Sequence, residues 1–75
     1  MSQSALDQLV QLSGLSPIFA STVIRRAVQR AGVDPSAFAA RDLERVLPEI
    51  ERALRVYIGE EAEARVAAIR AKMTR

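Results

Sequence analysis

The sequence contains no cysteine, no histidine and no tryptophan among its 75 residues. Without cysteine, neither a disulfide framework nor a thiolate metal site can form. The joint absence of histidine and cysteine also removes the Ser-His and Cys-His pairs of nucleophilic catalysis and most ligand sets for transition metals. We therefore expect no cofactor and no metal.

The remaining candidates for chemistry are carboxylates. The six glutamates could in principle supply a general acid-base pair or a hard-cation site. Several of them stand four residues from an arginine, the spacing of ordinary surface ion pairs on a helix. We therefore expect no enzyme activity, no catalytic residue and no small-molecule substrate. The glutamates and their spaced arginines are Glu44, Glu49 with Arg45, Glu51 with Arg55, Glu60, Glu61 with Arg65, and Glu63.

Long apolar runs are absent as well. No stretch approaches the length of about 18 consecutive apolar residues that a membrane-spanning helix needs. Residues 1–15 also lack the charged segment followed by an apolar one that is typical of a secretory signal peptide. We expect a cytoplasmic protein with no membrane partner.

Aromatic residues are scarce, with only Phe19, Phe38 and Tyr57 present, so the core must be aliphatic. Tyr57 lies on an apolar stripe and is expected in that core. A chain of 75 residues makes one domain, residues 1–75, and buries only about 60% of the surface that its unfolded chain exposes. Such a core is small, and self-association is therefore expected.

A repeated phrase gives the clearest structural signal: VQLSGLSP at 10–17 and VQRAGVDP at 28–35. Gly14 and Gly32 can each adopt the left-handed conformation that ends a helix, with the next aliphatic residue folding back in a Schellman ending. A capping residue and a proline then begin the following helix. The repeat therefore predicts two short connections between helices. The cap and proline pairs are Ser16 with Pro17 and Asp34 with Pro35.

Hydrophobic periodicity and these signals predict an all-α protein. The fold class is a small, compact, orthogonal four-helix bundle with short Gly-Pro connections. Pro48 interrupts the third helix, where we expect a kink; a complete break there would give five helices. Gly59 separates the last two helices. The expected helices are 5–13, 17–31, 35–58 with a kink near 48, and 60–73.

The outer side of the helix at 17–31 carries polar residues and no acid. We call this set the polar face; it comprises Ser21, Thr22, Arg25, Arg26, Gln29 and Arg30. Arginine suits guanine or phosphate, glutamine can read adenine, and hydroxyls suit phosphate oxygens. The formal charge of the whole chain is only +2, a weak electrostatic footprint for a nucleic-acid-binding protein.

The segment LDQLVQLSGLSPIFASTVIRR, residues 6–26, resembles the bacterial helix-turn-helix. Gly14, Leu15 and Ser16 match its turn, and Leu9 and Val23 match apolar positions of its two helices. The resemblance implies DNA binding, with the helix at 17–31 as the recognition helix. The segment departs from the pattern at Val10, where a small residue is usual, at Ala20, where a branched aliphatic is usual, and at residues 17–19, where a polar tip is usual.

Several apolar residues point instead to a protein partner. Ile18 is isolated within the polar sector of its helix, and Val56 lies opposite the apolar stripe of residues 43–58. The helix at 60–73 has an apolar stripe too narrow for a core helix, typical of a helix pressed on one neighbour or on a second subunit. The expected partner interface is Ile18, Val56, Val66, Ile69 and Met73.

Two functions therefore compete. The favoured hypothesis is a non-enzymatic regulatory or adaptor module that forms a homodimer or docks a partner protein. The alternative is a small DNA-binding protein that uses its first two helices and the polar face. A recognition helix reads bases chiefly with its N-terminal residues, and here those residues are apolar, which favours the protein-interaction hypothesis.

Overall fold

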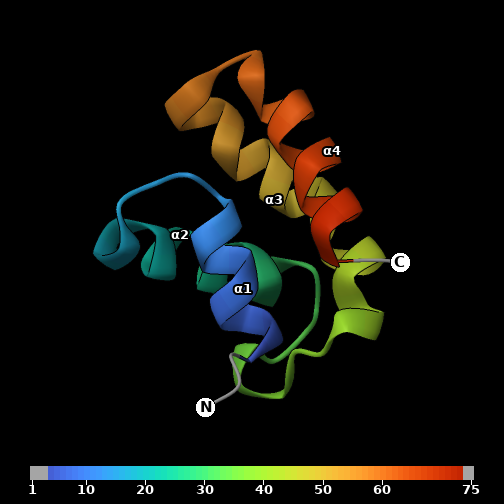
Figure 1. Ribbon diagram of the computed structural model, residues 1–75. Coiled ribbons are helices and arrows are strands. Elements are labelled where there is room, and N and C mark those ends of the chain that lie inside the picture. The colour runs from blue at the N-terminus through green and yellow to red at the C-terminus, as the bar shows by residue number, and fades with distance from the viewer. Residues whose placement is uncertain (1–3, 74–75) are drawn as a thin grey trace.

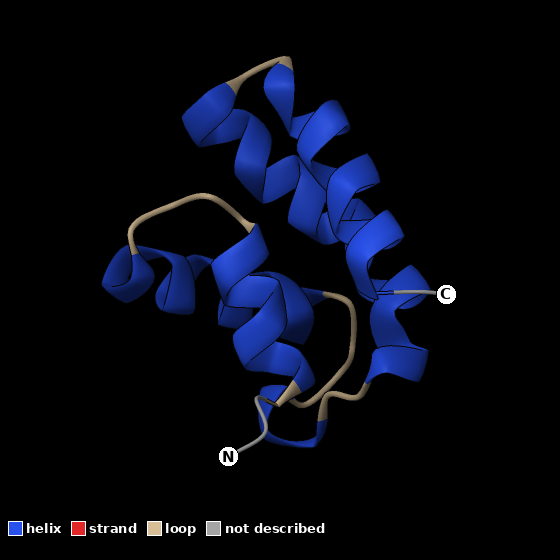
Figure 2. Cartoon of the chain, in the orientation of Figure 1, coloured by secondary structure: helices blue, strands red, loops and turns tan. Residues whose placement is uncertain are grey.

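The computed structural model describes residues 4–73. Figure 1 shows helical segments packed around one centre, and Figure 2 shows that this part of the chain contains no strand. The expected all-α fold is thus confirmed. The elements are α1 (Ala5–Leu12), α2 (Pro17–Arg30), the 3-10 helices η1 (Pro35–Ala37) and η2 (Ala40–Asp42), α3 (Leu43–Ile58) and α4 (Glu61–Met73).

The helices enclose a single aliphatic core. Helix α3 packs against both α2 and α4, and α1 packs against α2 and α4 (Figure 1). The buried side chains of the core cluster come from all four helices. The radius of gyration is 11.0 Å, close to the value of about 11 Å that the size of the chain predicts. The largest fully buried side chains include Leu9, Ile24, Leu43, Leu47, Ile50, Leu54 and Ile69.

The second of the two repeated connections is a Schellman ending, as predicted. Gly32 has a φ of +84°. Its N–H donates to the Gln29 carbonyl at 2.9 Å, and the N–H of Val33 donates to the Val28 carbonyl at 3.2 Å. These two bonds satisfy carbonyls that the end of α2 would otherwise leave without a donor.

In the first of the two connections, helix α1 ends differently from α2, although Gly14 also has a positive φ of +79°. The hydroxyl of Ser13 donates to the Val10 carbonyl at 2.6 Å and accepts from the Leu15 N–H at 3.4 Å. Ser13 therefore binds the carbonyl that Leu15 would bind in a Schellman ending, and that part of the prediction is wrong. Ser16 does precede α2 as expected, but its side chain makes no capping hydrogen bond.

The third helix begins later than the sequence predicts. Residues 35–42 form two 3-10 turns, and α3 starts only at Leu43. Asp34 holds the first turn by accepting from the Ser36 N–H at 2.9 Å, and Asp42 accepts from the Ala39 N–H at 3.1 Å. Such local side-chain bonds compete with continuous helix. They leave Phe38 extended, with a ψ of 131°, and its ring is buried in the core.

Helix α3 continues through Pro48 without a break. The five-helix alternative is therefore wrong. Pro48 is the sixth residue of the helix and lies on an exposed side, so the missing N–H leaves the Glu44 carbonyl facing solvent rather than the core. In the described part of the chain no helix has the length and apolar character needed to cross a membrane.

Candidate protein-interaction surface

Four large apolar side chains are exposed in the described chain, and they come from only two places. Ile18 is 89% exposed and Phe19 43%, both at the start of α2, whereas Val56 is 77% exposed and Tyr57 47%, both near the end of α3. We call these four residues the apolar patch. The two places are adjacent in space, because the rings of Phe19 and Tyr57 meet edge to face with centroids 4.7 Å apart and an interplanar angle of 88°.

A surface hollow of about 330 Å³ continues from the patch along the groove between α2 and α3. Three members of the patch line it, and the two helices supply the rest of its wall. Because Phe19 lies beside Tyr57 and the later part of α2 shares the hollow with Ala53, the two helices run in opposite senses along this groove. The lining residues are Phe19, Thr22, Val23, Arg26, Arg30, Ala53, Val56 and Tyr57.

The hollow joins the two surfaces that the sequence suggested separately. Thr22, Arg26 and Arg30 belong to the polar face, and Val56 belongs to the expected partner interface. Helix α2 places the two arginines one turn apart on the side that faces α3. An apolar floor flanked by guanidinium groups is the composition found in the energetic centres of protein interfaces.

The charge of α2 is unbalanced within the helix. It contains three arginines and no acid, while the rest of the chain contains eight cations and nine acids. Within residues 4–73 the ion pairs all lie on α3 and α4, and none involves Arg25, Arg26 or Arg30. The excess positive charge of the molecule is therefore concentrated on α2.

The polar face is largely available to solvent. Thr22, Arg25, Arg26, Gln29 and Arg30 are exposed, and Ser21 is half-buried and accepts a hydrogen bond from Arg25 Nε at 3.3 Å. All six residues thus lie together on α2, and Arg26 and Arg30 line the hollow.

Part of the expected partner interface is buried inside the chain. Val66 is 5% exposed and Ile69 is fully buried, because α4 packs against both α3 and α1. Met73 is half-buried against the same core. The narrow apolar stripe of α4 therefore contacts the chain's own helices, and Val66 and Ile69 are not part of an accessible surface. Ile18 and Val56 remain exposed, and each is the chain neighbour of one of the two rings that meet, Phe19 and Tyr57.

Sequence reasoning missed two members of the patch. Phe19 is not among the residues of the expected interface, and Tyr57 is expected in the core, yet both rings are nearly half exposed. The helical wheel averages over a whole helix, whereas these residues lie at helix ends, where fewer neighbours cover them. The signal available in the sequence was their position within two residues of Pro17 and Gly59, the residues that mark those ends.

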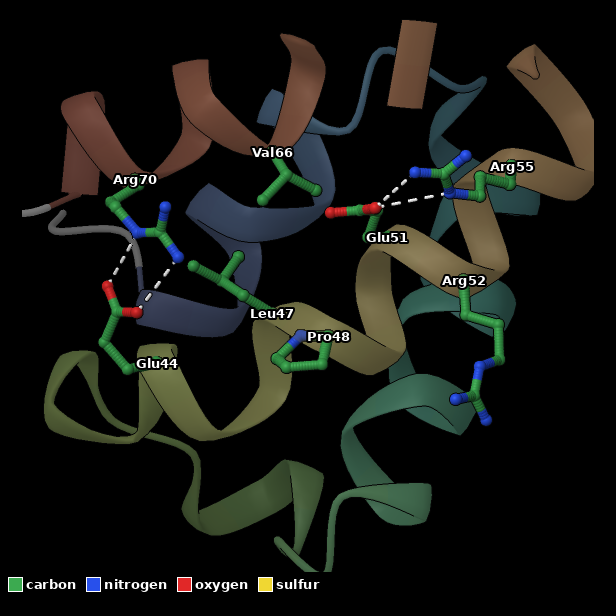
Figure 3. A pocket seen from close by; sticks show the side chains of 8 residues that line it. All are labelled: Glu44, Leu47, Pro48, Glu51, Arg52, Arg55, Val66 and Arg70. Atoms are coloured by element: carbon green, nitrogen blue, oxygen red, sulfur yellow. Dashed lines mark hydrogen bonds and ion pairs between the residues drawn. The ribbon is translucent and has the colours of Figure 1, made fainter. Parts of the chain in front are cut away.

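A second hollow, of about 410 Å³, lies between α3 and α4 (Figure 3). Arg70 spans it, with Nε 2.8 Å from Glu44 Oε2 and Nη2 3.0 Å from Glu44 Oε1. Arg55 donates two hydrogen bonds to a single oxygen of Glu51, Oε2, from Nη2 at 2.7 Å and from Nε at 3.2 Å. The hydrogen bonds that Arg70 donates to Glu44 raise the pKa of Arg70, and those that Arg55 donates to Glu51 raise the pKa of Arg55.

These ion pairs leave the α3–α4 hollow without a free carboxylate pair. Glu44 and Glu51 are each engaged by a different arginine, Glu44 by Arg70 and Glu51 by Arg55 (Figure 3). Among residues 4–73 no group of three or more acidic side chains is arranged to share a metal ion. The α2–α3 hollow, with its apolar patch, is the stronger candidate site.

Comparison with known proteins adds no assignment. No protein-family model matches the chain, and no match is found among curated proteins or among solved structures.

Proposed function

We propose that this chain is a non-enzymatic protein-interaction module, with a regulatory or adaptor role in the cytoplasm, and that the apolar patch is its docking surface. The observation that carries the proposal is the gathering of Ile18, Phe19, Val56 and Tyr57 at one place, the large apolar residues that the described chain leaves exposed. An isolated exposed apolar residue is ordinary, but a contiguous group is typical of an interaction site.

The composition of the surface supports the same function. Aromatic residues and arginine are enriched where protein interfaces concentrate their binding energy. The patch contributes Phe19 and Tyr57, and the adjoining hollow contributes Arg26 and Arg30. The Phe19–Tyr57 contact also limits the motion of both rings before binding, which reduces the entropy lost when a partner is bound.

Site-specific photo-crosslinking in the native cell tests the proposal. A photoreactive residue at position 56, in the patch, is compared with one at the exposed position 72 on α4. We expect position 56 to form a defined cross-linked protein product, identified by mass spectrometry, that position 72 does not form. The same product from both positions, or none from position 56, would contradict the proposal.

The alternative function is DNA binding through α1, α2 and the polar face. The observation that favours it is the unbalanced charge of α2, which has three arginines and no acid. The first turn of α2 weighs against it, because Ile18 and Phe19 occupy the end of the helix that would enter the major groove. Two arginines also face the α2–α3 hollow rather than the open side of α2.

A titration of labelled duplex DNA at two salt concentrations separates these functions. A DNA-binding protein would bind more tightly at low salt and lose affinity when Arg25, Arg26 and Arg30 are replaced by alanine. Absence of binding at low salt, or binding unaffected by these substitutions, would exclude the alternative.

A further inference from the structure

The lining of the α2–α3 hollow changes in character along its length. Phe19, Val56 and Tyr57, three members of the apolar patch, line one part of it. Arg26 and Arg30 line it farther along α2, about 10 and 16 Å from Phe19 along the helix axis at the standard rise per residue. An occupant of the hollow therefore meets apolar side chains on the patch and two guanidinium groups two to three helical turns farther on.

The positive charge in this hollow has no acidic partner in its lining. No acidic residue lines the hollow, and none of the ion pairs of the described chain involves Arg26 or Arg30. Glu49 stands one turn before Ala53 on α3, but its Oε2 lies 3.8 Å from Arg52 Nη1 and it is not part of the lining. Two guanidinium groups beside an apolar surface favour a ligand that brings negative charge of its own.

Three other surface hollows of the described chain have a different composition. The α3–α4 hollow contains Glu44 and Glu51 beside its arginines. A depression at the turn between these helices contains two glutamates beside Arg55, and one lined by α1 and α4 contains Glu61 beside its two cations. The α2–α3 hollow differs from all three because its cations share the lining with no acid.

The apolar part of the hollow favours a polypeptide over a nucleic acid as the source of that negative charge. Val56 and Ala53 are aliphatic and complement apolar side chains, which a nucleic-acid strand does not carry. Bases bind proteins by stacking on aromatic rings, whereas the rings of Phe19 and Tyr57 already contact each other edge to face. The volume of about 330 Å³ is at the lower end of the range for ligand pockets, so the hollow accepts a few side chains of one segment.

We infer that the occupant of this surface is an acidic amphipathic segment of a partner protein, with its apolar side chains on the patch and its carboxylates on Arg26 and Arg30. A groove between two helices commonly binds the apolar face of a third. On such a helix, apolar residues at positions i, i+3 and i+4 and acidic residues at i+7 and i+11 repeat the spacing of the α2 lining, in either chain direction. The inference rests on the proposed interaction function and specifies the chemistry of its partner.

Peptide selection on the folded protein tests the inference. A phage library of random peptides of about 16 residues, long enough as a helix to span the groove, is selected on the wild type and in parallel on a variant with Arg26→Gln and Arg30→Gln. The wild type should enrich peptides that carry two or more acidic residues beside an apolar cluster. The variant should enrich peptides without this excess of acidic residues.

The most enriched peptide is then synthesised with a fluorescent label and titrated by fluorescence polarisation. Its Kd should rise about tenfold on the variant with Arg26→Gln and Arg30→Gln, because two partly exposed ion pairs are lost. Replacing the acidic residues of the peptide by their amides should weaken binding to the wild type by a similar factor. Binding of the original peptide should also weaken as salt is added.

A matched variant controls for the change of net charge. Arg25→Gln with Lys72→Gln removes the same two charges from exposed residues that do not line the hollow. Its Kd for the peptide should stay within about twofold of the wild-type value, because exposed charges outside the contact are screened. Far-UV circular dichroism on every variant establishes that the helices are intact before the affinities are compared.

Three results would overturn the inference. They are a wild-type selection without enrichment of acidic residues, an affinity that is unchanged by Arg26→Gln and Arg30→Gln, and a control variant that loses as much affinity as this one. A short single-stranded oligonucleotide serves as a second probe. If it binds through Arg26 and Arg30 while the library yields no acidic peptide, the site is assigned to nucleic acid instead.

The photo-crosslinking experiment distinguishes the two levels of the proposal. The product captured by position 56 is digested, and the cross-linked segment is sequenced by mass spectrometry. If that segment carries no acidic residues, or belongs to a second copy of this chain, the interaction function stands and the acidic partner is wrong. If position 56 captures nothing, both are wrong.

Discussion

The guanidinium group of Arg65, on α4, lies directly over Gly14 in the connection between α1 and α2. A Cβ placed on Gly14 would be 2.5 Å from Arg65 Nη1 and 2.8 Å from its Cζ. The sequence suggested that Arg65 pairs with Glu61 one turn earlier, but no such pair is found in the described chain. Arg65 instead covers the end of α1, and Gly14 permits both the positive φ and this close approach.

The first prediction separates these two requirements. Gly14→Ala and Gly32→Ala both place a Cβ at a positive φ, so each should lower the free energy of unfolding by about 1 to 2 kcal/mol. Gly32 has open space around it and serves as the matched control. Arg65 is a flexible side chain that can move aside. The loss of unfolding free energy in Gly14→Ala should therefore exceed the loss in Gly32→Ala by less than about 0.5 kcal/mol. Urea denaturation measures both variants; a larger excess that disappears with Arg65→Ala would show that Arg65 is held rigidly.

The second prediction concerns the buried stripe of α4. Ile69 is fully buried, so Ile69→Ala should lower the free energy of unfolding by about 2 to 5 kcal/mol. The whole free energy of unfolding of a 75-residue chain is roughly 4 to 11 kcal/mol. The Ile69→Ala variant is therefore expected to be close to unfolding at 25 °C. Ile69→Val, with an expected loss of about 0.5 to 1.5 kcal/mol, keeps the prediction measurable.

The exposed Lys72 on the same helix provides the control for Ile69. Lys72→Ala should change the free energy of unfolding by no more than about 0.5 kcal/mol. If Ile69→Val weakened self-association without altering thermal or urea unfolding, the stripe would face a partner and its assignment to the core would be wrong.

The third prediction compares Pro48, inside α3, with Pro17, the first residue of α2. Pro48 lies inside α3, where it removes the hydrogen bond to the Glu44 carbonyl. Pro48→Ala should therefore raise the free energy of unfolding by about 2 to 2.6 kcal/mol after the added freedom of the unfolded chain is subtracted. Pro17 is the first residue of α2, where no hydrogen bond is lost. Pro17→Ala should therefore lower the free energy by about 0.4 to 1 kcal/mol. Equal signs for the two substitutions in urea denaturation would contradict this assignment.

The fourth prediction is a pH dependence. The hydroxyl of Ser36 and then its backbone N–H donate to Asp34 Oδ1, at 2.8 and 2.9 Å, and lower the pKa of Asp34 below its ordinary value of 3.8. A carboxyl whose pKa is lower in the folded state stabilises the fold at pH values above its ordinary pKa. That stabilisation should decline as the pH falls below 3.8 and through the folded-state pKa.

An NMR titration of the Asp34 carboxyl tests the cause of this shift. In Ser36→Ala the hydroxyl is lost and the backbone N–H remains, so the pKa of Asp34 should rise part of the way toward its ordinary value. An unchanged pKa in Ser36→Ala would show that the hydroxyl does not stabilise the charged form.

The sequence was most informative at the ends of helices. Gly14, Gly32 and Gly59 all have positive φ and all end helices, as their positions predicted, because few other residues adopt that conformation without strain. Ser4 accepts a hydrogen bond from the Asp7 N–H at 3.1 Å and so caps the start of α1. These features are local, and a local pattern is sufficient to identify them.

Features that depend on distant neighbours were not predictable in the same way. The narrow stripe of Val66 and Ile69 looked like a contact with a second subunit, yet it is covered by α1 and α3, which a helical wheel cannot show. The exposure of Tyr57 follows from where α2 begins relative to the end of α3. The apolar patch therefore emerged only when the packing of α2 on α3 was known, although Ile18 and Val56 had been selected from the sequence.

The position of α1 between α2 and α4 has a consequence for how the chain folds. Leu6 and Leu9 belong to the same core cluster as Val66 and Ile69, so segments about as far apart in sequence as this chain allows must meet before either is covered. Closing so long a loop costs conformational entropy before contacts compensate it. We therefore expect α1 to stay unshielded while the chain is being synthesised, until α4 has left the ribosome and the whole core assembles in one cooperative step.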